Sequence, residues 1–169
     1  MLFRSDPTIL GRSNYFGCAG LSGRGTSSLW AKYEGIFTNR SENALGSIPD
    51  GTSNTLMLGE AYGGDLQGRR LAIPTWMGVG MCPTWGGLAP GRLDVQHAAH
   101  FNSKHPGVVQ FCFADGSVRR LRKGSSWIDW LGFEVSTRWP DRYPADWWVL
   151  QELAGMRDGG TRDRSSIEN

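Results

Sequence analysis

Apolar and polar residues alternate along several short segments, and Gly-rich and Ser-rich loops separate those segments. The clearest case is 108–114, where Val109, Phe111 and Phe113 share one face at the period of two that is typical of a half-buried strand. These three side chains are predicted to point into the core, and Cys112 is predicted to face a second layer. The remaining strands are predicted at 13–17, 35–38, 54–60 and 75–79.

Asp-Gly and Pro-Gly pairs mark three predicted turns. Asp115-Gly116 follows the apolar strand and predicts a two-residue type I′ hairpin, in which Ala114 pairs with Ser117. Asp50-Gly51 lies beside a second apolar stretch. His105-Pro106-Gly107 precedes the strand at 108–114 and predicts a type II turn, because Gly enters positive φ without steric cost.

Two short helices are predicted near the C-terminal end. Ser126 is placed to cap a helix over 127–131. The second is predicted to begin near Pro144 and to end at Gly155, with its apolar side chains at helical spacing. After Met156 the segment 157–169 has almost no apolar content, and it is predicted to be a disordered tail.

Composition favours one β-rich domain. The 169 residues match the usual size of a single domain, assigned here to 1–156. The chain has 24 Gly, 8 Pro and 8 Trp, which favours many turns and aromatic anchors over a helical bundle. The predicted class is therefore α+β, with a mainly antiparallel sheet and short flanking helices.

Charge and hydropathy exclude some partners. The formal net charge is +2, and the only basic run, 119–123, reads as a solvated strand edge, so no nucleic-acid partner is predicted. No stretch approaches the ~18 consecutive apolar residues of a membrane span, and the first residues lack the apolar core of a signal peptide. Cys18, Cys82 and Cys112 allow at most one disulfide, and the sequence leaves their redox state open.

One group of residues is a candidate for metal binding. On a helix over 94–101, Asp94, His97 and His100 would share one face, as zinc ligands do. Glu60 is a further candidate for such a site. Surface or helix-end histidines are the competing interpretation, and no cofactor is predicted.

His105 and Asp115 invite interpretation as an acid/base or metal-binding pair, and strand geometry argues against it. His105 and Asp115 lie at opposite ends of the predicted strand, roughly 20 to 30 Å apart at ~3.3 Å per residue. Asp115 is therefore predicted to shape its turn. Alternation over 54–60 puts Asn54, Leu56, Leu58 and Glu60 on one face, so an inward Glu60 needs backbone N–H groups, Arg side chains or His105 as donors.

The tryptophans offer a binding alternative. An exposed, concave group of aromatic rings can stack on sugars, and the candidates are Trp76, Trp85, Trp139, Trp147 and Trp148. Core anchoring is the competing interpretation. No G-x-S-x-G elbow, Cys-His-Asn order or phosphate loop is present, and the chain is predicted not to be an enzyme.

Several uncommon strings occur in a characteristic order: Ser13-Asn14-Tyr15, Gly35-Ile36-Phe37, Asp50-Gly51-Thr52-Ser53-Asn54-Thr55, Gly59-Glu60, His105-Pro106-Gly107 and Phe113-Ala114-Asp115-Gly116-Ser117-Val118. Over residues 13–121 the chain resembles a large paralogous family typical of planctomycete bacteria. That family is known for a signature of His, nine residues, then Asp-Gly. It is catalogued as a domain of unknown function and as a pilin-like (pseudopilin-like) putative transporter or solute-binding family.

The resemblance implies a structural protein of the cell envelope. Members usually begin with a prepilin-type segment and a long apolar helix, followed by a β-rich head outside the cytoplasmic membrane. This sequence lacks that helix and is expected to represent the head. The implied function is that of a non-enzymatic, secretion-associated subunit that contacts other protein subunits. A carbohydrate- or solute-binding module, and a zinc- or calcium-binding domain, are the alternatives. Because pseudopilin heads of the wider class can bind calcium late in the chain, the resemblance makes Asp141 and Asp146 calcium candidates, although their spacing matches no EF-hand.

Overall fold

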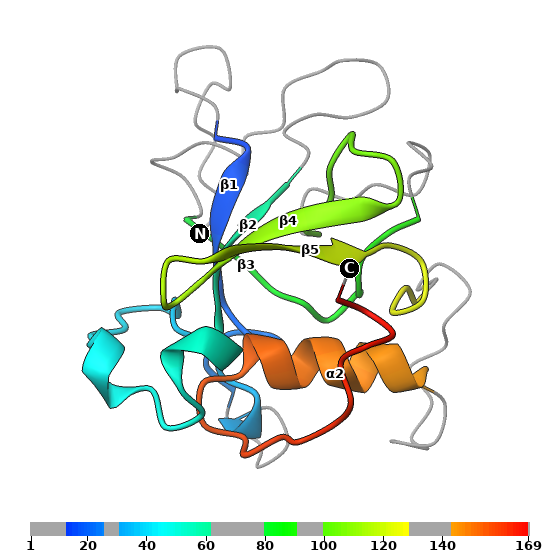
Figure 1. Ribbon diagram of the computed structural model, residues 1–169. Helices are drawn as coiled ribbons and strands as arrows, with labels where there is room; N and C mark the ends of the chain where they lie inside the picture. Colours follow the sequence, from blue (N-terminus) through cyan, green and yellow to red (C-terminus); the bar gives the residue numbers. More distant parts are fainter. Residues whose placement is uncertain (1–12, 26–30, 62–79, 91–99, 129–142, 169) are drawn as a thin grey trace.

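One five-stranded sheet organises the chain. The computed structural model describes residues 13–25, 31–61, 80–90, 100–128 and 143–168. The strands are β1 Tyr15–Cys18, β2 Leu56–Glu60, β3 Met81–Cys82, β4 Val108–Phe113 and β5 Val118–Arg122, in the sheet order β3-β1-β2-β4-β5 (Figure 1). Only the β1–β3 pair among them is parallel. The predicted α+β class with a mainly antiparallel sheet is confirmed.

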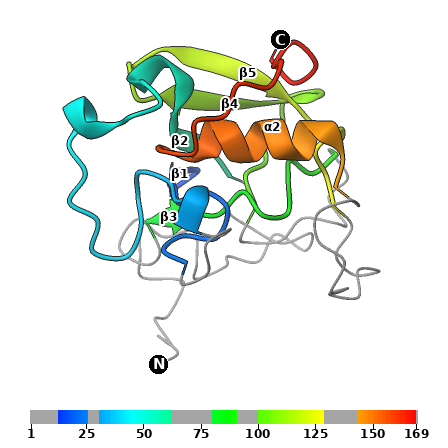
Figure 2. The same cartoon turned by 90° about the horizontal axis from the view of Figure 1, so that it is seen from below.

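The core lies between the sheet and helix α2, Ala145–Ala154. Figure 2 shows α2 running across one face of the sheet. Val109, Phe111 and Phe113 are buried on that face, as their alternation predicted, and they belong to one apolar cluster with Leu150 and Leu153 of the helix. Burying these side chains stabilises the fold by roughly 2 kcal/mol each.

Helix α2 agrees closely with its prediction. Pro144 stands immediately before the first helical residue, and the N–H of Gly155 closes the last turn on the carbonyl of Gln151. The helix is buried on more than one side because its other flank contacts the loop after β3. There Thr84 donates a hydrogen bond to the amide oxygen of Gln151 (2.5 Å), and that amide donates to the carbonyl of Thr84 (3.2 Å). None of the helices described here is long and apolar enough to cross a membrane.

The β4–β5 hairpin has a different turn from the one predicted. Cys112 pairs with Val118, and the N–H of Phe113 donates to the carbonyl of Ser117, so the loop contains three residues rather than two. Gly116 takes a φ of 83°, whereas Asp115 stays outside the left-handed region. A type I′ turn needs positive φ at both central residues, while the three-residue loop needs it only at the glycine.

The alternation predicted across β2 is wrong. The pairing of β2 with β4 shifts register between Leu56 and Leu58, which marks a β-bulge. Leu56 is fully buried, but Leu58 is only half-buried and lines the opposite face of the sheet. A bulge inserts one extra residue and reverses the side on which the following residues point. Asn54 lies outside the strand, in the 3-10 helix η2, Thr52–Asn54.

Other predicted strands have mixed outcomes. The segment 35–38 forms bends rather than a strand, although the N–H of Phe37 donates to the carbonyl of Cys18 beside β1. The predicted strand 75–79 lies outside the described residues, as does most of the predicted helix 127–131. The two-residue β3 was not predicted, because it is too short to carry an alternation. A second 3-10 helix, η1, spans Leu45–Ser47.

The segment 157–168 is packed on the domain, which contradicts the predicted disordered tail. Ile167 is fully buried, and its carbonyl accepts a hydrogen bond from the N–H of Arg122 on β5. Figure 1 shows this segment returning from α2 to the edge of the sheet. The low apolar content of this segment predicted disorder. The segment is nevertheless held in place, because the unpaired backbone groups of an edge strand can form hydrogen bonds with a polar segment that has only one apolar side chain.

Candidate functional site

The residues of the family signature lie at two separate ends of β4. At the first end Glu60, the last residue of β2, accepts a hydrogen bond from the N–H of Gln110 (2.9 Å). Its other oxygen lies 3.2 Å from Nε2 of His105, and that nitrogen lies 3.3 Å from the side-chain amide of Gln110. The Glu60 side chain is only 12% exposed. A backbone N–H and His105 were both among the predicted donors.

The loop before β4 is held by Ser103 and Lys123. The Ser103 hydroxyl donates to the carbonyl of Val108 (2.6 Å) and accepts the N–H of His105 (3.1 Å). The Lys123 ammonium donates to the carbonyls of Ser103 (2.5 Å) and His105 (3.1 Å). Burial lowers the pKa of Lys123, and the charge of Glu60 opposes that shift. Gly107 has a φ of 69°, as a type II turn requires.

Asp115 lies at the other end of β4 and contacts different residues. Its carboxylate accepts the N–H of Ser117 (2.8 Å) and lies 3.6 Å from the guanidinium of Arg119. The hydrogen bonds from Ser117 lower the pKa of Asp115, and the nearby Arg119 charge adds to the effect. Because Asp115 and His105 bond to separate groups, the two signature residues form no common site within the chain.

The Asp50-Gly51 pair anchors the C-terminal segment. The Asp50 carboxylate accepts the N–H groups of Asp158 (2.7 Å) and Gly159 (3.1 Å). The Asn54 amide donates to the carbonyl of Asp50 (2.9 Å), and its oxygen accepts from Arg164 (2.9 Å). Gly51 provides the turn with a φ of 88°. The sequence could not predict this contact, because the partners are more than a hundred residues apart.

The predicted metal ligands are not brought together among the described residues. His100 is buried, its ring meets Trp127 edge-on at 5.3 Å, and it packs against Gly86, where a Cβ would lie 2.0 Å from its Nε2. Asp94, His97 and Asp141 lie outside the described residues, and Asp146 accepts the hydroxyl of Ser166. Within the described ranges no three His, Cys, Asp or Glu side chains converge on a metal position.

The three described tryptophans among the sugar-binding candidates form an aromatic cluster rather than an open platform. Trp147 is fully buried, stacks on Tyr143 at 4.1 Å, and donates its indole N–H to the carbonyl of Trp85 (2.7 Å). Trp85 and Trp148 are half-buried around it. Trp76 and Trp139 lie outside the described residues. Trp147 therefore cannot serve as a sugar-stacking surface.

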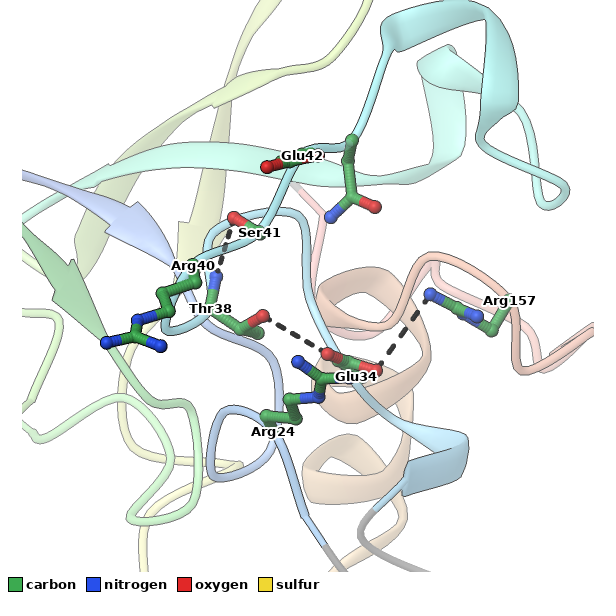
Figure 3. A pocket seen from close by; sticks show the side chains of 8 residues that line it. Arg24, Glu34, Thr38, Arg40, Ser41, Glu42 and Arg157 are labelled. Carbon is green, nitrogen blue, oxygen red and sulfur yellow. Dashed lines mark hydrogen bonds and ion pairs between the residues drawn. The ribbon is translucent and has the colours of Figure 1, made fainter.

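A polar pocket of about 310 Å³ lies beside the segment that links β1 to η1 (Figure 3). Glu34 accepts the hydroxyl of Thr38 (3.1 Å) and lies 3.9 Å from the guanidinium of Arg157. Arg24 and Arg40 also line the pocket, and neither has a hydrogen bond or ion pair within the described part of the chain. Arg40 has a φ of 57°, which is uncommon for a side chain of this size. The full lining is Arg24, Glu34, Thr38, Arg40, Ser41, Glu42, Asn43 and Arg157.

A second hollow, of about 280 Å³, lies on the face of the sheet opposite α2. Leu58 and Cys112 contribute to it, and their side chains point away from the core as a result of strand alternation and the β2 bulge. Tyr15 is 61% exposed at its rim and Val118 is 65% exposed. Strand alternation in the sequence is enough to predict that Cys112 lies on this face. The position of Leu58 on the same face depends on the β2 bulge, which the sequence did not predict.

A family model described as a protein of unknown function (DUF1559) matches residues 4–123, which is more than half of the chain. The chain belongs to the DUF1559 family. The match confirms the family to which the residue strings pointed, and it includes the signature elements of β1, β2 and β4. No curated protein and no solved structure matches the chain.

Proposed function

We propose that this DUF1559 protein is a non-enzymatic, pilin-like head that assembles with neighbouring protein subunits of the cell envelope through the sheet face opposite α2. The observation that carries the proposal is a hollow on that face with a mainly apolar lining, in which Gln110 is the one polar residue. Tyr15, Leu58, Cys112 and Val118 surround one hollow there, while α2 covers the opposite face. Exposed apolar side chains gathered in one patch are typical of protein-contact surfaces.

The signature residues support a scaffold role. Glu60 and Lys123 hold the turn at His105, Asp115 closes the β4–β5 loop, and Asp50 fixes the C-terminal segment. In each case a charged side chain is occupied by backbone groups of the chain itself. Such bonds shape loops and keep the sheet rigid, and a rigid surface loses less entropy when a subunit docks on it.

Substitution of Val118 by Glu is expected to weaken self-association of the purified full chain by at least about tenfold. The reason is that a charge replaces an apolar contact worth roughly 1.5 kcal/mol at the proposed interface. Sedimentation velocity over a concentration series measures the change. Leu45→Glu is the matched control, because Leu45 is 52% exposed on η1 and does not line the hollow. Equal association of both variants and the wild type would contradict the self-contact.

A second candidate function, the binding of an anionic solute, is favoured by the pocket at Arg24 and Arg40. Two guanidinium groups without a carboxylate partner in the described part of the chain can form paired hydrogen bonds to an oxyanion. Glu34 and Thr38 can accept bonds from ligand hydroxyl groups, since the Thr38 hydroxyl already donates its hydrogen to Glu34. The lining has no large apolar side chain, which suits a small acidic sugar better than an apolar ligand.

Titration with glucuronate tests this second candidate. Arg24→Gln and Arg40→Gln are each expected to weaken binding about tenfold, since each removes one charge-assisted hydrogen-bonding group. Arg120→Gln is the control, because Arg120 is exposed on β5 outside the pocket. Neutral glucose should not compete, whereas inorganic phosphate competes if any oxyanion suffices. Absence of saturable glucuronate binding up to about 10 mM would reject the candidate.

A further inference from the structure

The cysteines of β1 and β3 lie directly opposite each other. Cys18 is the last residue of β1 and Cys82 the last residue of β3, and they are Cα partners in the parallel pairing of these strands. The N–H of Ala19 donates to the carbonyl of Cys82 (3.0 Å), and the N–H of Gly17 donates to the carbonyl of Gly80 (2.9 Å). These bonds flank the pair and fix its register.

Both side chains enter the same part of the core. Cys18 is fully buried, Cys82 is 3% exposed, and the two belong to one apolar cluster with Phe16. Neighbouring strands are ~4.8 Å apart, which falls within the 4.4–6.8 Å range of Cα separations that a disulfide spans. Strand partners that share a face therefore meet the main geometric requirement for a bridge.

Cys112 does not meet that requirement. It lies on β4, which is separated from β1 by β2, so its backbone is about 10 Å from Cys18 and farther from Cys82. Its side chain also lines the hollow on the opposite face of the sheet. Of the three bridges that three cysteines allow, the fold permits one.

We propose that Cys18 and Cys82 form a structural disulfide that ties the edge strand β3 to β1 when the chain folds in the presence of a disulfide oxidant. A two-residue strand has few hydrogen bonds of its own, and β3 pairs with β1. The bridge would close a loop of roughly 65 residues, which restricts the unfolded chain strongly.

The chemistry is thiol–disulfide exchange with a small-molecule disulfide such as oxidised glutathione. One protein thiolate attacks the reagent and forms a mixed disulfide, releasing one glutathione thiolate. The second protein thiolate then attacks the protein sulfur of that mixed disulfide and releases the other. Two protein thiols lose two electrons and two protons, and one reagent disulfide becomes two thiols.

Burial of the two thiols in the folded protein slows this exchange, so the exchange is faster before folding is complete. Burial raises the pKa of the Cys18 thiol to about 12 and also raises the pKa of Cys82. Thiolate is the reacting form, so the folded, reduced protein should oxidise slowly, and the bridge should form during folding. After folding, the same burial should protect the bridge from added reductant.

Refolding the full chain with a mixture of reduced and oxidised glutathione tests the inference. After alkylation and trypsin digestion without reduction, the peptides 13–24 and 71–92 should be found joined, and the peptide 105–119 should carry alkylated Cys112. The oxidised protein should unfold about 10 °C above the reduced protein. Cys112→Ala should form the same bridge, whereas Cys18→Ala should form none within the chain.

Three alkylated cysteines after refolding at an oxidising glutathione ratio would overturn the proposal. A bridge that contains Cys112 would also overturn it, and so would linkage only between chains. The mapping uses the wild-type chain and needs no variant to fold. Its outcome is independent of whether the sheet face opposite α2 binds other subunits.

Discussion

Replacement of Trp147 by alanine is expected to lower the free energy of unfolding by about 4 kcal/mol. The Trp147 side chain is fully buried at the centre of the aromatic cluster and stacks on Tyr143 at 4.1 Å. The variant leaves a large cavity between α2 and the loop at Trp85. It also removes the donor to the carbonyl of Trp85. Urea unfolding followed by circular dichroism measures the change.

Two further substitutions separate the contributions of burial and of the indole hydrogen bond to this loss of stability. Trp148→Ala is expected to cost about half as much, because Trp148 is only half-buried. Trp147→Phe keeps most of the ring packing and isolates the loss of the indole hydrogen bond, about 1 kcal/mol. If Trp147→Ala changed stability by less than about 1 kcal/mol, Trp147 would not be a core anchor, and the sugar-stacking interpretation would regain support.

Gly59→Ala is expected to lower the free energy of unfolding by about 3 kcal/mol. A Cβ on Gly59 would lie 2.4 Å from the ring of Phe111 and 2.6 Å from the ring of Phe101. Both rings are fully buried and pack edge to face at 5.0 Å, so neither can move aside cheaply. Thermal or urea unfolding of the variant measures this cost, which arises from overpacking rather than from a lost contact.

Gly46→Ala is the matched control for Gly59→Ala. Gly46 lies on η1, and a Cβ there would meet no heavy atom within 4 Å. Its substitution should change stability by no more than about 0.5 kcal/mol. A Gly59→Ala protein as stable as the Gly46→Ala protein would mean that the rings of Phe101 and Phe111 do not close over the backbone of β2.

The elements that could be predicted are those whose signals are local. The alternation at 108–114 and the spacing between Pro144 and Gly155 each depend on residues a few positions apart, and the structure contains both elements. The family could also be predicted from short sequence motifs, each of which spans a few residues. The strand predicted at 35–38 is absent. Its residues Gly-Ile-Phe-Thr include β-prone types, but the segment forms bends beside β1 and does not pair as a strand.

The candidate sites were harder to predict because their residues come from distant segments. Glu60 was identified with two correct kinds of donor, but by an alternation that the β2 bulge breaks. The arginine pocket was missed altogether. Arg24 and Arg157 are separated by most of the chain, and no local pattern indicates that they line one cavity. The anchoring of residues 157–168 by Asp50 was missed for the same reason.

The sequence by itself determined the class of fold, the inward face of β4, the boundaries of α2 and the family, because periodicity, Pro-Gly punctuation and short motifs act within a few residues. Tertiary structure alone decided the register of β2, the packing of the C-terminal segment and the direct pairing of Cys18 with Cys82. Those features depend on which backbone groups remain unpaired at a neighbouring strand, and that is settled only when the whole sheet has formed.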